Sequence, residues 1–520
     1  MSRIKKLFSV HNIAELGVLL LLCAYPLFVT NYYYNITVSK MSFFAISASL
    51  AFFVCSMLTV MKADFSLISS KAALKKLTAT DWFMAVFLFA CTVSCLISDY
   101  RQKAFFGTGG RYMGLLMMIF VVLAYFFISK YYVMRERDLY IFAFAFSVLV
   151  AIGVLQFIGF DPFGFLAATP EKYHKNFIAT LGNINVFSSY ICICSPVAMY
   201  NYCFARKGIR SVIWLAVSCI GFLALFVCNS DGGYIGYGVA FVACGYMSLR
   251  SSDAVKKFFR LAAAFFICGK AFWLLGEKST LDVREFSVMT QMVIAKQYTY
   301  IIIAVFVIIS LVLWKLNLPE KLLKAARIAY VACAVLAVAA VAAVMVYFSV
   351  INTEAQLSGL GKLFRFNDDW GTFRGYAWRW TVTAFSDYPF INKLFGMGED
   401  TLALVLRPLF PEEMRETGLY FDNAHNEFLQ YLATVGLVGV ISYIGALGTC
   451  VVKLLRGTSV FKSAFAVAVI AYAAQSCINI LQPITSPLVF VFIGLVMCRD
   501  EPANPPALSE QTPESVQVNE

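Results

Sequence analysis

The chain has 520 residues, of which 60% are hydrophobic and only 14% are charged. Soluble domains carry about 25% charged residues, so this composition excludes a soluble enzyme and predicts a protein of the lipid bilayer. The net charge is +12, but no basic stretch stands apart from the apolar ones as a polyanion-binding domain would, which argues against a nucleic-acid partner. We attribute the positive excess to membrane topology.

Apolar stretches divide the sequence into spans of the length that crosses a bilayer, about 20 residues per helix. We expect an all-α polytopic membrane protein with about fourteen transmembrane helices, at residues 13–30, 41–61, 81–98, 112–129, 139–158, 185–205, 211–228, 233–249, 261–276, 299–314, 328–350, 426–449, 463–481 and 485–498. The predicted parts are helices 1–11 in residues 1–350, one large extracytoplasmic loop with short amphipathic helices in 351–425, helices 12–14 in 426–498, and a disordered cytoplasmic tail in 499–520.

The distribution of Lys and Arg predicts the orientation. If the N-terminus is cytoplasmic, the inner segments carry 25 basic residues and the short outer loops carry 9, with a further 7 in the large loop. Short cytoplasmic loops are enriched in Lys and Arg, whereas long loops report orientation poorly. We therefore expect a multi-pass membrane protein with both termini in the cytoplasm and the loop 351–425 outside.

The fifteen cysteines lie inside apolar stretches or at their ends, so they are not the paired loop cysteines of a disulfide framework. Cys91 and Cys95 share a helix face, but no His or acidic residue lies nearby in that span. We predict that the cysteines are packing residues and that they bind no metal.

Ionisable residues inside the predicted spans are scarce. The main ones are Glu15, near an end of the first span, and Lys270. Ion-coupled carriers usually need carboxylates in central spans, so this scarcity argues against such a carrier. Lys270 is expected to reach the interface along its apolar stem, although a lysine there can also pair with a phosphate.

The large loop contains a segment with helical spacing. Between residues 374 and 388, Arg374, Trp378 and Phe385 fall on one side, and Pro389 ends the pattern. The segment is too short and too charged to span the membrane. We expect an amphipathic helix on the outer membrane surface, with Trp378 and Trp380 at the depth of the headgroups.

Only three histidines occur, and His425 alone lies where an outward loop meets a span. The motif His425-Asn426, nine residues, then Gly436-x-x-Gly439 places the imidazole at the top of a helix whose first turns pack closely through glycine. The positive N-terminal end of that helix is expected to lower the pKa of His425.

These residues resemble the O-antigen ligase and O-antigen polymerase superfamily, which includes the bacterial O-linked oligosaccharyltransferases. Besides the His425 motif, the resemblance is carried by Arg374-x-x-x-Trp378 with the following Pro389 and Gly396-x-Gly398, by Gly182-Asn-Ile-Asn185, and by Gly107-Thr-Gly-Gly-Arg-Tyr-Met-Gly114. It implies transfer of a glycan from a polyprenyl diphosphate to a glycan, lipid or protein acceptor on the outer face of the bacterial plasma membrane, without a cofactor.

The resemblance also implies roles for single residues. Arg374 and His425 would be catalytic, Arg374 by holding diphosphate oxygens and His425 as the general base or as a diphosphate ligand. Substrate would be bound by Arg111, Trp378, Arg379, Asn183, Asn185, Asn426 and Asp422, and Asp422 would also orient the imidazole. The adjacent pair Asp368-Asp369 is not the spaced acidic cluster of a metal site, so we expect arginine-based, metal-independent stabilisation of charge.

Two departures from the family pattern affect this expectation. Ile184 stands where a proline is usual, and Asn229-Ser-Asp-Gly-Gly233 stands where many ligases have a Ser-Arg pair. The missing arginine favours a polymerase or a divergent transferase. A transporter or flippase of lipid-linked oligosaccharide, and a structural membrane partner without activity, are the alternatives to an enzyme.

Overall fold

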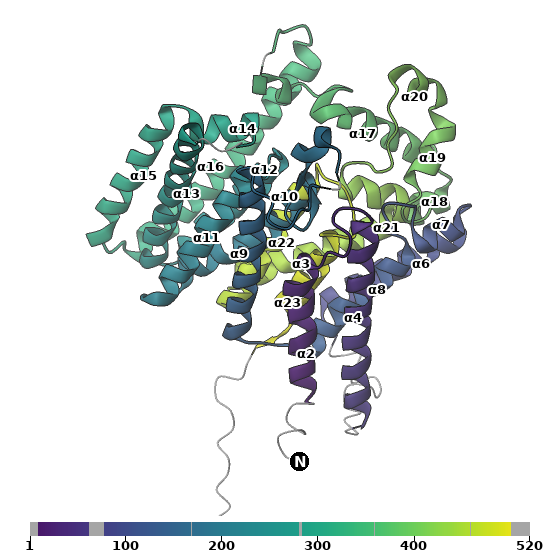
Figure 1. Ribbon diagram of the computed structural model, residues 1–520, viewed down its shortest axis with the longest axis horizontal. Coiled ribbons are helices and arrows are strands. Elements are labelled where there is room, and N and C mark those ends of the chain that lie inside the picture. Colours follow the sequence, from purple (N-terminus) through teal and green to yellow (C-terminus); the bar gives the residue numbers. More distant parts are fainter. Residues whose placement is uncertain are drawn as a thin grey trace, which may run out of the picture.

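The computed structural model describes residues 9–61, 77–167, 169–279, 283–357, 359–457 and 459–500. Within these ranges the chain is almost entirely helical, and its strands have two residues each (Figure 1). The all-α prediction is confirmed. Most of the predicted tail lies outside the described residues, but its first two residues form strand β4 (Arg499–Asp500), which pairs in parallel with β1 (Val133–Met134).

A helix overlaps each of the fourteen predicted spans. These helices are α2 (Val10–Leu19) continued by η1 (Leu20–Ala24) and α3 (Tyr25–Leu27), α4 (Ile36–Met61), α6 (Ala79–Ile97), α8 (Leu115–Tyr131), α9 (Glu136–Phe157), α10 (Ile184–Phe204), α11 (Ile209–Val227), α12 (Gly232–Ser248), α13 (Ser252–Lys278), α15 (Tyr298–Lys315), α16 (Glu320–Val346) continued by η5 (Tyr347–Ile351), α21 (Glu427–Arg456), α22 (Val460–Ser476) and α23 (Ser486–Met497).

Shorter elements connect them: α7 (Arg101–Phe106), η3 (Glu171–Asn176), the antiparallel pair β2 (Phe177–Ile178) and β3 (Gly182–Asn183), α14 (Val288–Thr290) and η4 (Gln291–Ala295). Among the described helices, nine are long and apolar enough to cross a membrane, and α8, α22 and α23 are shorter apolar helices. These findings indicate a multi-pass membrane protein, while the number of fourteen spans stays a prediction.

The helices form a central layer and a periphery. Helices α10, α22 and α23 lie in the centre, where nearly every side chain of α10 and α23 is buried. Small residues such as Ala464, Ala466 and Ala468 let α22 approach its neighbours closely, as is usual for helices packed in a bilayer. Helix α15 lies at the edge of the molecule (Figure 1). The apolar side chains of α15 and α16 are largely exposed.

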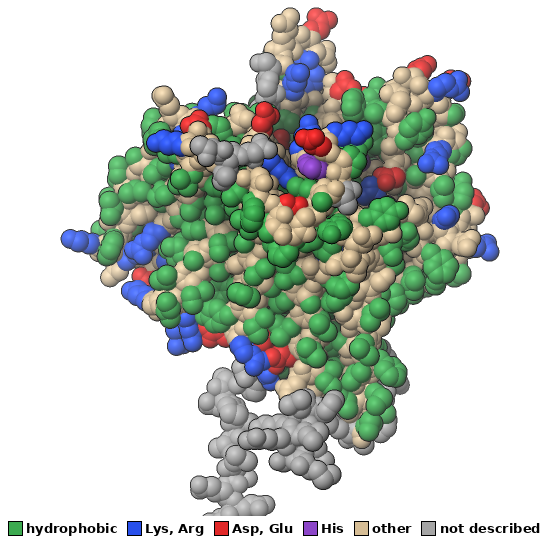
Figure 2. Space-filling model, viewed as in Figure 1, with side chains coloured by type: hydrophobic (Ala, Val, Ile, Leu, Met, Phe, Trp, Pro, Cys, Tyr) green, Lys and Arg blue, Asp and Glu red, His purple; other side chains and the backbone are tan. Residues whose placement is uncertain are grey.

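The surface matches this arrangement. In Figure 2, hydrophobic side chains form a broad zone across the middle of the molecule, and charged side chains gather above and below it. Such a zone is what a chain in contact with lipid requires, because a charged side chain at the centre of a bilayer is costly.

More ionisable residues are buried in the helices than the sequence suggested. Glu15 is partly buried, and besides Lys270 the described helices bury six further charged residues: Lys40, Asp81, Asp138, Lys256, Lys257 and Glu427. Lys40 lies inside α4, where its ammonium donates to the backbone oxygens of Tyr25 (2.9 Å) and Pro26 (2.6 Å) at the end of the preceding helix. The sequence placed Lys40 in a loop because its apolar stretch begins one residue later.

Lys270 and Glu15 have structural partners. The ammonium of Lys270 donates to the carbonyl oxygen of Ala295 at 2.7 Å, so it caps η4. Glu15 forms ion pairs with Arg135 and Arg137. Neither residue is left as an isolated charge.

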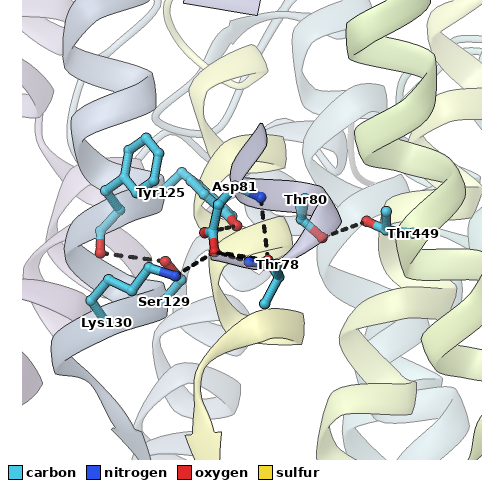
Figure 3. Close-up of polar contacts among 8 residues, drawn as sticks. Thr78, Thr80, Asp81, Tyr125, Ser129, Lys130 and Thr449 are labelled. Atoms are coloured by element: carbon cyan, nitrogen blue, oxygen red, sulfur yellow. Dashed lines mark hydrogen bonds and ion pairs between the residues drawn. The ribbon is translucent and has the colours of Figure 1, made fainter. Parts of the chain in front are cut away.

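Asp81 belongs to a closed polar cluster between α6 and α8 (Figure 3). Its carboxylate accepts hydrogen bonds from Tyr125 (2.7 Å), from the backbone and hydroxyl of Thr78 (2.7 and 2.9 Å) and from Lys130 (2.5 Å). The neighbouring residue Thr80 donates to Thr449, near the end of α21 that lies far from His425. This cluster therefore lies at the opposite end of the bundle from the His425 motif.

The large loop 351–425 has a hydrophobic core of its own. It contains η6 (Gly359–Phe364), α17 (Trp370–Ser386), α18 (Phe390–Phe395), α19 (Leu402–Leu409) and α20 (Pro411–Thr417). The first residues of α17 have left-handed backbone angles, so its regular helix starts at Arg374, as predicted.

The prediction that Trp380 lies at the headgroups is wrong. Its side chain is fully buried, its ring stacks on Phe410 with centroids 5.4 Å apart, and its indole N–H donates to Glu413 at 2.8 Å. Leu402 and Leu406 of α19 pack in the same cluster. The apolar side of α17 thus faces the loop's own core, because α19 and α20 fold back onto it.

Candidate functional site

His425 is held in a tight turn before α21. Its backbone has a positive φ of 52°, an unusual conformation for a residue other than glycine. The side chain of Asn423 accepts from the His425 backbone N–H at 3.0 Å, and the side chain of Asn426 caps the helix by accepting from Phe428 (3.0 Å) and Leu429 (3.1 Å). These bonds fix the backbone of the turn that carries the imidazole, and they give the predicted substrate ligand Asn426 a structural task.

Arg111 reaches the same turn from a distant segment. Its guanidinium donates to both carboxylate oxygens of Asp422, from Nε at 2.9 Å and from Nη2 at 2.7 Å. This fork-to-fork geometry is the strongest arrangement for the two groups. Both oxygens of Asp422 are therefore engaged by Arg111, and among the described residues none donates to or accepts from the ring of His425.

Arg374 is a guanidinium with unused hydrogen-bonding capacity. Its Nη1 donates to the backbone oxygen of Gly371, but its buried Nε has no hydrogen-bond partner among the described residues. Burial lowers the pKa of Arg374, although the charge of Asp231 opposes this effect. A desolvated cation with a free donor is suited to bind an anion.

Trp378 lies one turn further along α17 than Arg374. Its ring packs against Trp370 and Phe366, with centroids 5.3 and 5.7 Å apart. The indole N–H of Trp378 is also buried without a hydrogen-bond partner in the described part of the chain. Residues four apart in a helix lie on one face, so this face of α17 carries two unused N–H donors.

The charges of both arginines act on His425. Burial, followed by the positive charges of Arg374 and Arg111, lowers the pKa of His425 to about 4, and Asp422 opposes this effect. The imidazole is therefore neutral near pH 7 and able to accept a proton. The direction agrees with the prediction from the helix end, but the causes are desolvation and the two arginines. Residues from the segments 107–114, 370–386 and 422–427 thus meet around one imidazole.

Arg379 is engaged elsewhere. It donates to both oxygens of Asp368 (2.9 and 3.0 Å) and to Glu413 (2.7 Å). These contacts tie the start of α17 to α20, so we assign Arg379 to bracing the loop. They also occupy Asp368, the first residue of the acidic pair considered for metal binding. No group of three or more His, Cys, Asp or Glu side chains in the described ranges is placed to hold a metal ion.

The turn with Asn183 and Asn185 joins three helices. Asn183 accepts from the Asn185 backbone at 2.8 Å and so caps α10. The side chain of Asn185 accepts from Ser230 at 2.7 Å, and its carbonyl oxygen accepts from Asn479 at 2.9 Å. Asp231, beside Ser230, is the residue whose charge acts on Arg374. This turn therefore supports one side of the site through the N-terminus of α12.

The two glycine motifs meet at a kink in α21. Gly436 has a φ of 74° and interrupts the helix, which frees the carbonyl oxygens of Ala433 and Thr434. The backbone N–H groups of Met397 and Gly398 donate to these oxygens at 3.2 and 3.0 Å. A side chain at Gly436 would collide with the backbone of the opposing segment. The segment around Gly396-x-Gly398 is thus built into the helix that starts at the imidazole.

One residue of this region was missed by the sequence analysis. Asp400 is buried, and its carboxylate accepts from the backbone N–H groups of Thr108 (2.7 Å) and Met113 (3.3 Å). Burial raises the pKa of Asp400 to about 6, although these bonds oppose the shift. The only signal in the sequence was its position just after Gly396-x-Gly398, which does not reveal a contact with residues 108–113.

Comparison with known proteins bears on this region. Residues 286–444 match the family model described as O-antigen ligase. The matched range contains Arg374, Trp378 and His425, whereas Arg111, Asn183 and Asn185 lie outside it. Searches of curated proteins and of solved structures gave no match. The family match confirms, for this part of the chain, the resemblance to the O-antigen ligase and O-antigen polymerase superfamily that the sequence shows.

Proposed function

We propose that this protein transfers or polymerises saccharide from a polyprenyl-diphosphate carrier on the outer face of the bacterial plasma membrane. The observation that carries the proposal is the meeting of Arg111, Arg374 and a neutral His425 at one place, contributed by three distant segments. The acceptor would be a glycan, a lipid or a protein.

The reaction makes two chemical demands. The acceptor hydroxyl attacks the anomeric carbon and loses its proton, while the bond from that carbon to the diphosphate oxygen breaks and the lipid diphosphate leaves. We assign removal of the proton to His425, because a buried neutral imidazole can accept it.

The leaving diphosphate gains negative charge, which fixed cations stabilise. Arg374 offers its unpaired Nε to a diphosphate oxygen, and the unpaired indole N–H of Trp378 offers a second hydrogen bond. Arg111 is already oriented by Asp422 through Nε and Nη2, so its remaining nitrogen is available to the substrate. We therefore propose stabilisation by arginine, without a metal ion.

The orientation rests on the basic residues of the short loops, 25 inside against 9 outside. This asymmetry supports cytoplasmic termini and an outward-facing His425 site. It also agrees with the position of the Asp81 cluster at the other end of the bundle. That cluster is a closed set of ion pair and hydrogen bonds (Figure 3), whereas a flippase needs polar groups free to meet substrate on both sides.

The test uses purified protein and a polyprenyl-diphosphate oligosaccharide, with and without candidate acceptors. A polymerase should give a ladder of longer lipid-linked glycans from this donor alone, and a ligase should give product only when its acceptor is present. EDTA should leave the rate unchanged. If no acceptor gives product, while the protein in vesicles moves the donor lipid between leaflets, the transporter alternative holds.

A further inference from the structure

The segment that contains Gly396-x-Gly398 is hydrogen-bonded to both α21 and α6. On one side, Met397 and Gly398 bind the carbonyl oxygens freed at the kink of α21. The hydroxyl of Ser94 in α6 accepts from the Gly398 N–H at 2.9 Å and donates to the carbonyl oxygen of Thr434 at 2.5 Å. On the other side, Ser98 donates to the carbonyl oxygen of Met397 at 2.6 Å.

Asp400 extends this segment to the loop that carries Arg111. One oxygen of its buried carboxylate accepts from the backbone of Thr108 and of Met113, which flank Arg111 on either side. The loop needs such an anchor, because Gly107, Gly110 and Tyr112 all have a positive φ. Two charge-assisted bonds across the loop hold the backbone from which the guanidinium projects.

We propose that Asp400 is a positioning residue for the transfer reaction: it fixes the loop 107–114 and thereby sets the place of the Arg111 guanidinium beside His425. The inference rests on the proposed function of Arg111 and His425. The segment 397–400 then contacts the first part of α21 at the kink and is linked to its N-terminal end near His425. It binds the carbonyl groups at the kink directly, and it acts on the end near His425 through Arg111 and Asp422.

The backbone of Asp400 determines the variants for the test. Its φ is 57°, a conformation that alanine tolerates poorly and that glycine and asparagine accept. Asp400→Gly removes the acceptor without straining the backbone, and Asp400→Asn keeps an oxygen for the two N–H groups. Glu416→Ala, an exposed carboxylate of the same large loop, is the matched control.

The first measurement is hydrogen exchange of the backbone amides in 107–114, which needs no substrate. Exchange should rise in Asp400→Gly and stay near wild type in Asp400→Asn and Glu416→Ala. Unchanged exchange in Asp400→Gly would show that Asp400 does not hold the loop.

The second measurement is transfer from a polyprenyl-diphosphate oligosaccharide. Asp400→Gly should slow turnover by roughly 10²-fold, the loss expected when a reacting group is misplaced by about 1 Å, and Asp400→Asn should recover most of it.

In an Arg111→Ala background, Asp400→Gly should cause no further loss, because the group that Asp400 positions is gone. Independent losses in the double variant would overturn the proposal. If Asp400→Gly cannot be purified, Asp400→Ser takes its place in the same comparison of exchange and rate, because the serine hydroxyl is one atom too short to reach both N–H groups. A wild-type protein without transfer, but with the expected exchange pattern, would instead refute the proposed function.

Discussion

The guanidinium of Arg111 binds both carboxylate oxygens of Asp422, which lies 311 positions later in the chain. Asp422 precedes His425 by three residues, so this ion pair joins the loop before α8 to the turn that holds the imidazole. The two residues act on His425 in opposite directions, because Arg111 lowers its pKa and Asp422 raises it.

This opposition predicts the pH dependence of transfer. The wild-type rate should fall only as the pH approaches about 4, where His425 becomes protonated and no longer accepts a proton. Arg111→Ala removes a charge that disfavours the imidazolium, so the acidic limb of the kcat/KM profile should move to higher pH. Asp422→Asn leaves Arg111 without its counter-charge and should move this limb to lower pH. Shifts of both variants in one direction would contradict the arrangement.

Arg374 should contribute more to turnover than to folding. Because its Nε is buried without a partner, Arg374→Ala should lower kcat by roughly 10²–10³-fold, the loss seen when one charge-stabilising donor is removed. Arg374→Lys keeps the charge but not the planar fork, so it should recover only part of the rate. Arg415→Ala, an exposed arginine of the same loop, serves as the control and should leave the rate unchanged. Wild-type rates in both Arg374 variants would make this residue structural.

Gly436 should tolerate no side chain. Its φ is 74°, and an added Cβ would collide with backbone atoms of Leu394 and Phe395. Gly436→Ala should therefore lower the thermal unfolding temperature and release the segment 396–398 from α21. Gly448→Ala is the matched control, because it lies in the same helix with open space around it. Equal unfolding temperatures for the two variants would mean that the kink is not constrained.

The sequence predicts the elements of this protein better than their contacts. Apolar stretches located a helix at each predicted span, because burial in lipid requires long apolar segments whatever the tertiary structure. The predicted start of the second span at residue 41 was wrong, because Lys40 was taken to lie outside the span. In the structure, α4 starts five residues earlier and the ammonium caps the preceding helix. A partner from another helix overrode the local signal.

In the candidate site, too, single residues are easier to predict than their contacts. His425 and Arg374 belong to recognisable sequence motifs, and these motifs predict that the two residues lie in one site. Trp378 and Trp380 have the same local signature, yet one lies beside the site with an unpaired N–H and the other is buried in the loop core. Their difference depends on α19 and α20, which are distant in sequence. The contact of Asp400 with residues 108–113 is equally long-range, so no local pattern predicts it.

Membrane orientation can be tested with single cysteines at exposed positions. Lys172→Cys and Thr417→Cys should react with an impermeant thiol reagent added to intact cells, because the basic asymmetry places both outside. Asn317→Cys, between α15 and α16, should react only in inverted vesicles. Labelling is compared with that of the unsubstituted protein, whose native cysteines set the background. The reverse pattern would place the His425 site in the cytoplasm and exclude the proposed outer-face reaction.

His425 should be the residue whose loss affects transfer most. It has a strained backbone conformation held by Asn423, and its ring is free of hydrogen bonds from the described residues. Burial and two arginines lower its pKa and keep it neutral. His425→Ala should abolish transfer while the protein still folds, because the backbone bonds of the turn remain. His425→Gln separates the two possible roles, since glutamine keeps hydrogen bonding but cannot accept and pass on a proton. A general base predicts that the Gln variant is as inactive as the Ala variant, whereas a diphosphate ligand predicts near-normal turnover in Gln and a raised KM for the donor in Ala. His174→Ala is the control, because that ring is hydrogen-bonded to the backbone oxygen of Thr169 and lies in another loop. Wild-type turnover in His425→Ala would remove the imidazole from the reaction altogether.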